Sequence, residues 1–288
     1  MLLAGCDFSS SPSRRKPIVF ATGHLQRDRV QLAQFERVES LDDFSRWLLQ
    51  DRPWLCAFDL PFGLPRELVT SLGWPELWVD CMQHYASLTR PEIRRTFAAF
   101  CNARPVGKKF AHRVTDIPAG SSSSMKWVNP PVAYMLHAGV PRLMAAGVQI
   151  PGLSTVAMDT TASPRIAVEG YPGLLARELL QQASQAAGLS AKTRSYKNDA
   201  KALQTPERLI ARKDMLTALE NGQTRLGLRL KLTHAQRDRL VDDATGDSLD
   251  AVLCMMQAAW AHQQHVDGKP RYGLPAQVDP LEGWIITA

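Results

Sequence analysis

The chain has 288 residues, of which 45% are apolar and 22% are charged, and its formal net charge is +6. This composition is ordinary for a soluble globular protein, and the length allows one large domain or two small ones. No apolar run approaches the roughly 20 residues that a membrane-spanning helix needs, and the N-terminus lacks the basic and apolar regions of a signal peptide. We therefore expect a cytoplasmic protein without a membrane partner. Its modest positive charge permits a polyanionic substrate but does not require one.

The beginning of the chain predicts an antiparallel meander, a helix and a buried strand. Apolar and alternating segments indicate strands at 2–8, 17–25 and 28–38. A helix begins at the Ser40-Leu-Asp-Asp43 segment, which is similar to a capping box, and Pro53 ends it. Residues 54–59 are apolar up to a final aspartate, which predicts a strand buried on both faces and paired in parallel.

The middle of the chain, from about 66 to 160, predicts a helical insertion between two strands of the sheet. It is interrupted by a four-serine loop at 120–124 and by Pro130-Pro131, after which a helix is expected at 131–147. A strand at 164–169 then returns to the sheet. The remaining predicted elements are helices at 172–187, 199–221, 233–242 and 246–265 and a late edge strand at 283–287.

This element order predicts a single α/β domain over residues 1–288. Three strands in a meander, followed by alternating helices and strands, imply a mixed sheet with the first strand central and helices on both faces. Asp7 and Asp59 would then lie at the ends of adjacent strands. The last long helix, packed across the sheet, could bring Asp247 and Asp250 over them.

Carboxylates stand where apolar segments end, and we expect them to converge on one site. Asp7, Asp59 and Glu169 each close an apolar run, and Asp247 and Asp250 share one face at the head of an apolar helix because they are three residues apart. A carboxylate at the end of a buried strand is costly unless it is hydrogen-bonded or binds a cation. Oxygen ligands suit Mg2+ and Mn2+, so the pattern predicts a site for one of these ions.

Each carboxylate also has a structural alternative. Asp7 and Asp59 could be turn residues, since a loop or a Leu-Pro step follows them. Asp247 could be a helix N-cap, and Glu169 could pair with an arginine. The five cysteines favour buried free thiols in a reducing compartment. Their spacing to histidines does not predict zinc, because no CxxC or HxxxH is present.

Six short motifs follow one another along the chain: Asp7 after the first strand, Phe58-Asp-Leu-Pro-Phe-Gly63, Glu169-Gly-Tyr-Pro172, Tyr196-Lys197, Asp247-Ser-Leu-Asp-Ala251 and Glu282-Gly-Trp-Ile285. Together they resemble the DUF429 family, a group of predicted nucleases with a ribonuclease H-like fold. The resemblance extends from residue 2 to residue 286 and covers the helical insertion poorly. The Asp-x-x-Asp on the last helix is most similar to the RuvC resolvase branch of that fold.

The resemblance implies a metal-dependent hydrolase of phosphodiester bonds. Asp7, Asp59 and Asp250 would ligate one or two Mg2+ or Mn2+ ions with help from Asp247, and Glu169 would be a fourth ligand or would orient the attacking water. Two ions about 4 Å apart would activate that water and stabilise the leaving oxygen. The resemblance further suggests two phosphate contacts, each with a surface salt bridge as its alternative: Arg113 and Lys197.

Two other functions remain open from the sequence. A phosphotransferase of the actin or sugar-kinase type shares this kind of sheet, but the Asp7-Phe-Ser-Ser-Ser11 turn lacks the glycine that a phosphate cradle needs. A non-catalytic binding protein would keep the carboxylates for structure. Basic residues are dense at 90–113, whereas only 7% of residues are aromatic. A nucleic acid would therefore be contacted mainly by the insertion, or the substrate is a small phosphodiester.

Overall fold

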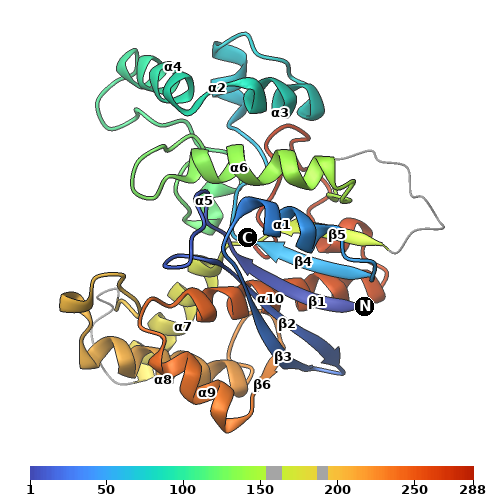
Figure 1. Ribbon diagram of the computed structural model, residues 1–288, viewed down its shortest axis with the longest axis vertical. Coiled ribbons are helices and arrows are strands. Elements are labelled where there is room, and N and C mark those ends of the chain that lie inside the picture. Colours follow the sequence, from blue (N-terminus) through green and yellow to red (C-terminus); the bar gives the residue numbers. More distant parts are fainter. Residues whose placement is uncertain (154–163, 187–193) are drawn as a thin grey trace.

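The computed structural model describes residues 1–153, 164–186 and 194–288 and contains one six-stranded mixed sheet (Figure 1). The strand order is β5-β4-β1-β2-β3-β6. The strands are β1 Leu2–Asp7, β2 Ile18–Gln26, β3 Arg29–Val38, β4 Trp54–Phe58, β5 Arg165–Glu169 and β6 Arg229–Lys231. β1 pairs antiparallel with β2 and parallel with β4, and β2 pairs antiparallel with β3. The predicted α/β class, the meander and the central first strand are thus confirmed.

Side chains on successive residues of the sheet belong to two separate cores. On β1, Ala4 and Cys6 pack on one face with α1 (Leu41–Leu48) and the helices that follow β4. Leu3 packs on the other face with the C-terminal helices. Those helices are α7 Pro172–Ala186, α8 Pro206–Glu220, α9 His234–Asp242 and α10 Asp247–Val266. This alternation decides which strand-end residues can meet α10.

The insertion between β4 and β5 is helical, as predicted. It contains α2 Arg66–Ser71, α3 Trp78–Ser87, α4 Arg90–Asn102, α5 Asp116–Ala119 and α6 Val132–Ala145. In Figure 1, α2, α3 and α4 lie above α6, on the side of the sheet away from α7, α8 and α9. Tyr85 and Phe97 stack at 5.9 Å between ring centroids and join α3 to α4. Residues 154–160, which were expected to end the insertion, lie outside the described residues.

Two expectations in the C-terminal half need correction, and one short strand was not expected. The helix expected at 199–221 begins only at Pro206, after a short 3-10 turn at Lys201–Leu203, because Pro is favoured in the first helical turn. The short β6 was not predicted, since only Leu230 of its three residues is buried. The tail at 283–287 forms no strand; Ile285 makes one isolated parallel bridge to Glu169.

The last long helix lies directly against the central strand. A methyl group added to Gly5 of β1 would lie 2.1 Å from the backbone oxygen of Ala251 and 2.1 Å from the backbone nitrogen of Met255. Only glycine permits so close an approach of a helix backbone to a strand. This contact places the N-terminal end of α10 over the carboxyl ends of β1 and β4. No described helix combines the length and apolar character that crossing a membrane would require.

Candidate active site

Asp7 and Asp59 lie side by side at the carboxyl ends of the neighbouring strands β1 and β4. Cys6 is in register with Phe58, and the Asp59 backbone N–H donates to the Cys6 carbonyl at 2.9 Å. Because Leu3 and Leu55 face α10, the alternation carries both aspartates to that same face. The expected juxtaposition of these two residues on adjacent strands is therefore present.

Asp250 and Asp247 reach the same edge from α10. The helix starts after Gly246, whose φ is 79°, and the Asp250 N–H donates to the Gly246 carbonyl at 2.8 Å. Asp250 is fully buried. Capping is done by Asp243, which accepts a hydrogen bond from the Ser248 N–H at 3.0 Å. Asp247 is thus the first helical residue and not the cap, which leaves its carboxylate on the site.

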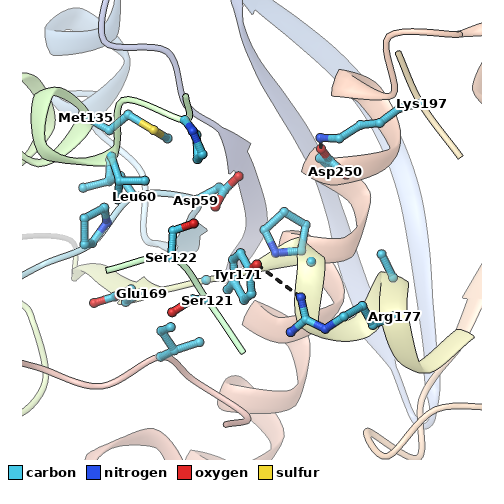
Figure 2. A pocket seen from close by; sticks show the side chains of 18 of the residues that line it. Asp59, Leu60, Ser121, Ser122, Met135, Glu169, Tyr171, Arg177, Lys197 and Asp250 are labelled. Atoms are coloured by element: carbon cyan, nitrogen blue, oxygen red, sulfur yellow. Dashed lines mark hydrogen bonds and ion pairs between the residues drawn. The ribbon is translucent and has the colours of Figure 1, made fainter. Parts of the chain in front are cut away.

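Asp250 has two polar partners on an irregular segment before α8. The Tyr196 hydroxyl donates to Asp250 Oδ1, and the Lys197 ammonium forms an ion pair with Oδ2. Figure 2 shows the lysine side chain reaching down to this carboxylate. Gly246 allows the approach, because a Cβ there would lie 2.8 Å from that of Lys197. Lys197 is thus paired with a buried acid of the site.

The four aspartates share one electrostatic environment. Burial raises the pKa of Asp7 well above its usual range, and the charges of Asp250, Asp247 and Asp59 raise it further, against a lowering by Lys197. Burial, followed by the charge of Asp250, raises the pKa of Asp59 to about 7. Burial lowers the pKa of Lys197, but the charges of Asp250, Tyr196 and Asp7 and the hydrogen bond to Asp250 together outweigh burial, so the pKa is raised. Without a bound cation, the cluster therefore favours the protonated forms of Asp7 and Asp59 over four charged carboxylates side by side.

Neither Asp7 nor Asp59 has a hydrogen-bonded partner for its carboxylate within the described residues. A turn-capping role, the structural alternative for both, requires such a bond. Nearby, the Ser11 N–H bonds to the Ser9 hydroxyl instead. The two carboxylates are thus open to an added cation.

The donor set suits a hard divalent ion, although its present arrangement does not hold one. Four carboxylates supply only oxygen, which is the chemistry that Mg2+ and Mn2+ prefer. Within 1–153, 164–186 and 194–288, no three His, Cys, Asp or Glu side chains are placed to bind an ion as they stand. Both oxygens of Asp250 are already engaged by Tyr196 and Lys197. An ion bound by Asp250 would have to share these oxygens with Tyr196 and Lys197 or displace one of them.

Glu169 and Arg113 form a structural ion pair beside this cluster. The guanidinium of Arg113 contacts both carboxylate oxygens of Glu169, at 2.6 and 2.8 Å, and also contacts Asp116 at 2.9 Å. Arg113 is 1% exposed. Glu169 further accepts a hydrogen bond from the Phe62 N–H at 2.9 Å. The arginine pairing considered for Glu169 is present, while the expected phosphate contact of Arg113 is replaced by a buried salt bridge.

Strand register places Glu169 on the opposite face of the sheet from the aspartates, although it lines the same cavity as Asp59 and Asp250. Glu169 is in register with Phe58, whereas the position beside Asp59 on β5 belongs to Gly170, whose N–H bonds to the Phe58 carbonyl at 2.8 Å. Glu169 therefore takes the Phe58 face of the sheet, away from α10. A Cβ on Gly170 would meet the Cys254 sulfur at 3.2 Å, so a larger residue there would press against α10.

Glu282, from the motif Glu282-Gly-Trp-Ile285, helps to hold Arg113 and the segments around the salt bridge in place. The carboxylate of Glu282 accepts backbone N–H bonds from Arg66 at 2.7 Å and from Val114 at 2.8 Å. Its carbonyl accepts a bond from Arg113. Gly63 is pressed against the same turn, since a Cβ there would lie 2.5 Å from the Glu282 carbonyl oxygen. Sequence reasoning missed this structural role of Glu282, and it missed Tyr196 as the partner of Asp250.

A cavity of about 460 Å³ opens beside the carboxylates. Asp59, Asp250 and Lys197 line it, together with the guanidinium of Arg177, which donates to the Tyr171 hydroxyl at 3.2 Å. Figure 2 shows Asp59 directed into this space, opposite the Lys197–Asp250 pair. Its volume lies in the range of about 300–1,000 Å³ typical of small-molecule sites. A single ligand in the cavity would therefore contact carboxylates, cationic side chains and apolar surface.

The chain matches no protein-family model, no curated protein and no solved structure.

Carboxylates and cationic side chains line the same cavity, which suits a reaction at an anionic group of a bound ligand. A divalent ion at Asp7 and Asp59 would balance the charge of these carboxylates when they are ionised. Lys197 or Arg177 could form an ion pair with an anionic group of a ligand in the cavity. The Lys197 side chain is 42% exposed, so a ligand in the cavity can reach it, whereas the Arg177 guanidinium donates to the Tyr171 hydroxyl and to the Ala119 carbonyl. The arrangement thus places carboxylates and cationic side chains on the wall of one cavity.

Proposed function

We propose that this protein is a divalent-metal-dependent nuclease or phosphodiesterase of the DUF429 family with a ribonuclease H-like fold. The observation that carries the proposal is the convergence of Asp7, Asp59, Asp247 and Asp250 at one edge of the sheet. An antiparallel meander followed by parallel strands, with β1 in the middle, is the sheet expected for that fold. A purely structural cluster would neutralise its members, whereas Asp7 and Asp59 keep unpaired carboxylates within the described residues.

The proposed roles follow from position. Asp7, Asp59 and Asp250 would hold Mg2+ or Mn2+, and Asp247 would assist from the first turn of α10. When bound, the ion would supply the positive charge that attack on a phosphodiester requires. Tyr196 fixes the orientation of Asp250 through its hydroxyl. Lys197 and Arg177 would hold the phosphate by its negative charge. Glu169 and Arg113 serve the stability of the sheet edge and not the reaction.

The substrate class that fits is a nucleic acid strand or another phosphodiester that places one phosphate in the cavity. We also propose a cytoplasmic location, because all five cysteines are buried free thiols, which is typical of a reducing compartment.

One observation favours a second candidate, a non-catalytic protein of the same fold. Asp250 is already neutralised by Lys197, as it would be if the cluster served structure alone. In that case added metal would leave the stability unchanged. The two candidates therefore differ in a single measurable property.

Melting and cleavage measured in parallel test the proposal. Wild type and the Asp7→Asn and Asp59→Asn variants are melted in chelator, in Mg2+ and in Mn2+, since an ion bound only to the native state raises the melting temperature. Cleavage is followed on single-stranded, duplex and branched nucleic acids. Asp199→Asn is the matched control, because Asp199 is an exposed carboxylate paired with Lys16.

We expect a metal-dependent rise in melting temperature and metal-dependent cleavage in wild type and in Asp199→Asn, and neither effect in the two site variants. Absence of any metal-dependent shift in wild type would overturn the metal site and favour the non-catalytic protein. ATP hydrolysis without cleavage of nucleic acid would favour a phosphotransferase.

A further inference from the structure

Lys197 is the cation that contacts the carboxylate cluster in this structure. Its ammonium pairs with Asp250, whose side chain is 0% exposed, while 42% of the lysine side chain remains exposed. Among the residues that the structure describes, no other lysine or arginine forms an ion pair with Asp7, Asp59, Asp247 or Asp250. Of the described lysines and arginines, Lys197 is thus the one that pairs with a member of the cluster, while Lys16 acts on Asp7 and Asp247 from a longer range.

This contact occupies the oxygen that a metal ion would need. Tyr196 takes Oδ1 of Asp250 and Lys197 takes Oδ2, so the carboxylate has both oxygens engaged. The lack of any three described side chains placed for an ion agrees with this engagement. An ammonium and a divalent ion both bind a carboxylate oxygen at short range, so they compete for it.

We propose that Lys197 is a built-in cation that occupies Asp250 while the site is metal-free and is displaced from it when Mg2+ or Mn2+ binds. The inference rests on the proposed function, because it requires an ion held by Asp7, Asp59 and Asp250. Lys197 lies in a segment, residues 194–200, without helix or strand. Its ammonium can therefore leave Asp250 without unfolding a regular element. It remains on the wall of the cavity, where an anionic substrate meets it.

Titration calorimetry with Mn2+ tests this competition. Lys197→Met keeps the length of the side chain and removes its charge. Lys16→Met is the matched control: Lys16 lies in the electrostatic range of Asp7 and Asp247 but forms its ion pair with the exposed Asp199. Lys197→Met should bind Mn2+ about tenfold more tightly than wild type, which is within the usual range for two ligands that exclude each other. Lys16→Met should stay within about threefold, because its charge is screened.

The outcomes of this titration either support or overturn the displacement of Lys197 by a metal ion. Equal or weaker Mn2+ binding by Lys197→Met than by wild type overturns the proposal, since removal of a competitor cannot weaken binding. Binding by Lys197→Met without measurable binding by wild type supports it in its strongest form. Absence of binding in wild type and in both variants overturns the proposed function, and with it the inference.

A measurement on the unmodified chain covers the case in which Lys197→Met does not fold. Wild type is treated with an amine-acetylating reagent with and without Mn2+, and the modification of Lys197 is compared by mass spectrometry with that of Lys16. Mn2+ should increase acetylation of Lys197 severalfold and leave that of Lys16 unchanged. Unchanged acetylation of Lys197 at a Mn2+ concentration that raises the melting temperature would show that the ion binds without displacing the lysine.

Discussion

Gly5 and Ala251 lie in backbone contact, so that a methyl group on Gly5 would come within 2.1 Å of the Ala251 carbonyl oxygen. Asp7 is two residues beyond Gly5 on β1, and Asp250 immediately precedes Ala251 on α10. The distance between these two acids is therefore set by a contact between main chains. Rotation of the side chains can move the carboxylates, but it cannot move the two Cα atoms apart.

Gly5→Ala should accordingly disturb both stability and the carboxylate cluster. Because the added methyl group meets backbone on α10, we expect a loss of at least about 3 kcal/mol of unfolding free energy, the upper part of the usual range for overpacking. Gly147→Ala is the control, since Gly147 has a positive φ but open space around it, and should lose about 1 kcal/mol. Urea unfolding measures both. Equal losses for the two variants would show that α10 can move away from β1.

Asp59 should make the metal-free protein less stable as the pH rises. Its pKa is raised from 3.8 to about 7, so folding favours the protonated acid. The associated stability is complete below about pH 4 and is lost as the pH rises through about 7. Asp59→Asn removes this loss. In chelator, its advantage over wild type should grow from near zero at about pH 4 to at most about 4 kcal/mol at about pH 8. Urea unfolding across pH tests this, and a pH-independent difference would contradict it.

Glu169→Gln should lower the stability of the protein and leave its Mn2+ affinity almost unchanged, which would distinguish Glu169 from the four aspartates. The change leaves the buried guanidinium of Arg113 with less negative charge around it, and loss of one partner of a buried pair costs about 3–5 kcal/mol. Since Glu169 faces away from α10, the Mn2+ affinity should change by less than about twofold. Unfolding and calorimetry on the same sample check both statements. Loss of Mn2+ binding in a folded variant would make Glu169 a ligand after all.

Tyr196→Phe should weaken the fold through Asp250. A hydrogen bond to a charged acceptor contributes about 1.5–3 kcal/mol, and this one joins a buried hydroxyl to a buried carboxylate. Tyr134→Phe is the control because its hydroxyl lies 3.4 Å from the Arg90 carbonyl oxygen on an exposed surface. We expect the control to lose less than about 0.5 kcal/mol. A thermal melt of each variant in chelator distinguishes the two effects.

The sequence predicted the sheet well because its strands are apolar runs bounded by clear turns. The continuous run at Trp54–Phe58 indicated a strand buried on both faces, and it lies between β1 and β5. Asp7 and Asp59 could be placed together because each follows directly on its strand and the two strands are parallel neighbours.

The same apolar runs made it impossible to predict on which face of the sheet Glu169 lies. In Ile166-Ala167-Val168 both faces are buried, so no alternation of polar and apolar residues shows which face the next residue takes. Register with β4 decides it, and register depends on pairing that a single sequence does not contain.

The partners of the acids could not be predicted for a related reason. Lys197 and Tyr196 belong to an irregular segment, where no periodicity links a residue to a face of the fold. Arg113 reaches Glu169 across 56 positions of the chain. Such pairs follow from how the elements pack, so sequence motifs indicated that these residues matter without indicating what each one contacts.

The separation of the four acids along the chain also has a consequence for synthesis. Asp7 and Asp59 are made early, but Asp247 and Asp250 belong to α10, the last long helix. Because the chain leaves the ribosome from its N-terminus, the cluster cannot assemble until α10 has emerged and packed on Gly5. In a growing chain the cluster is therefore incomplete, and the metal binding proposed for it requires α10 to have emerged and packed.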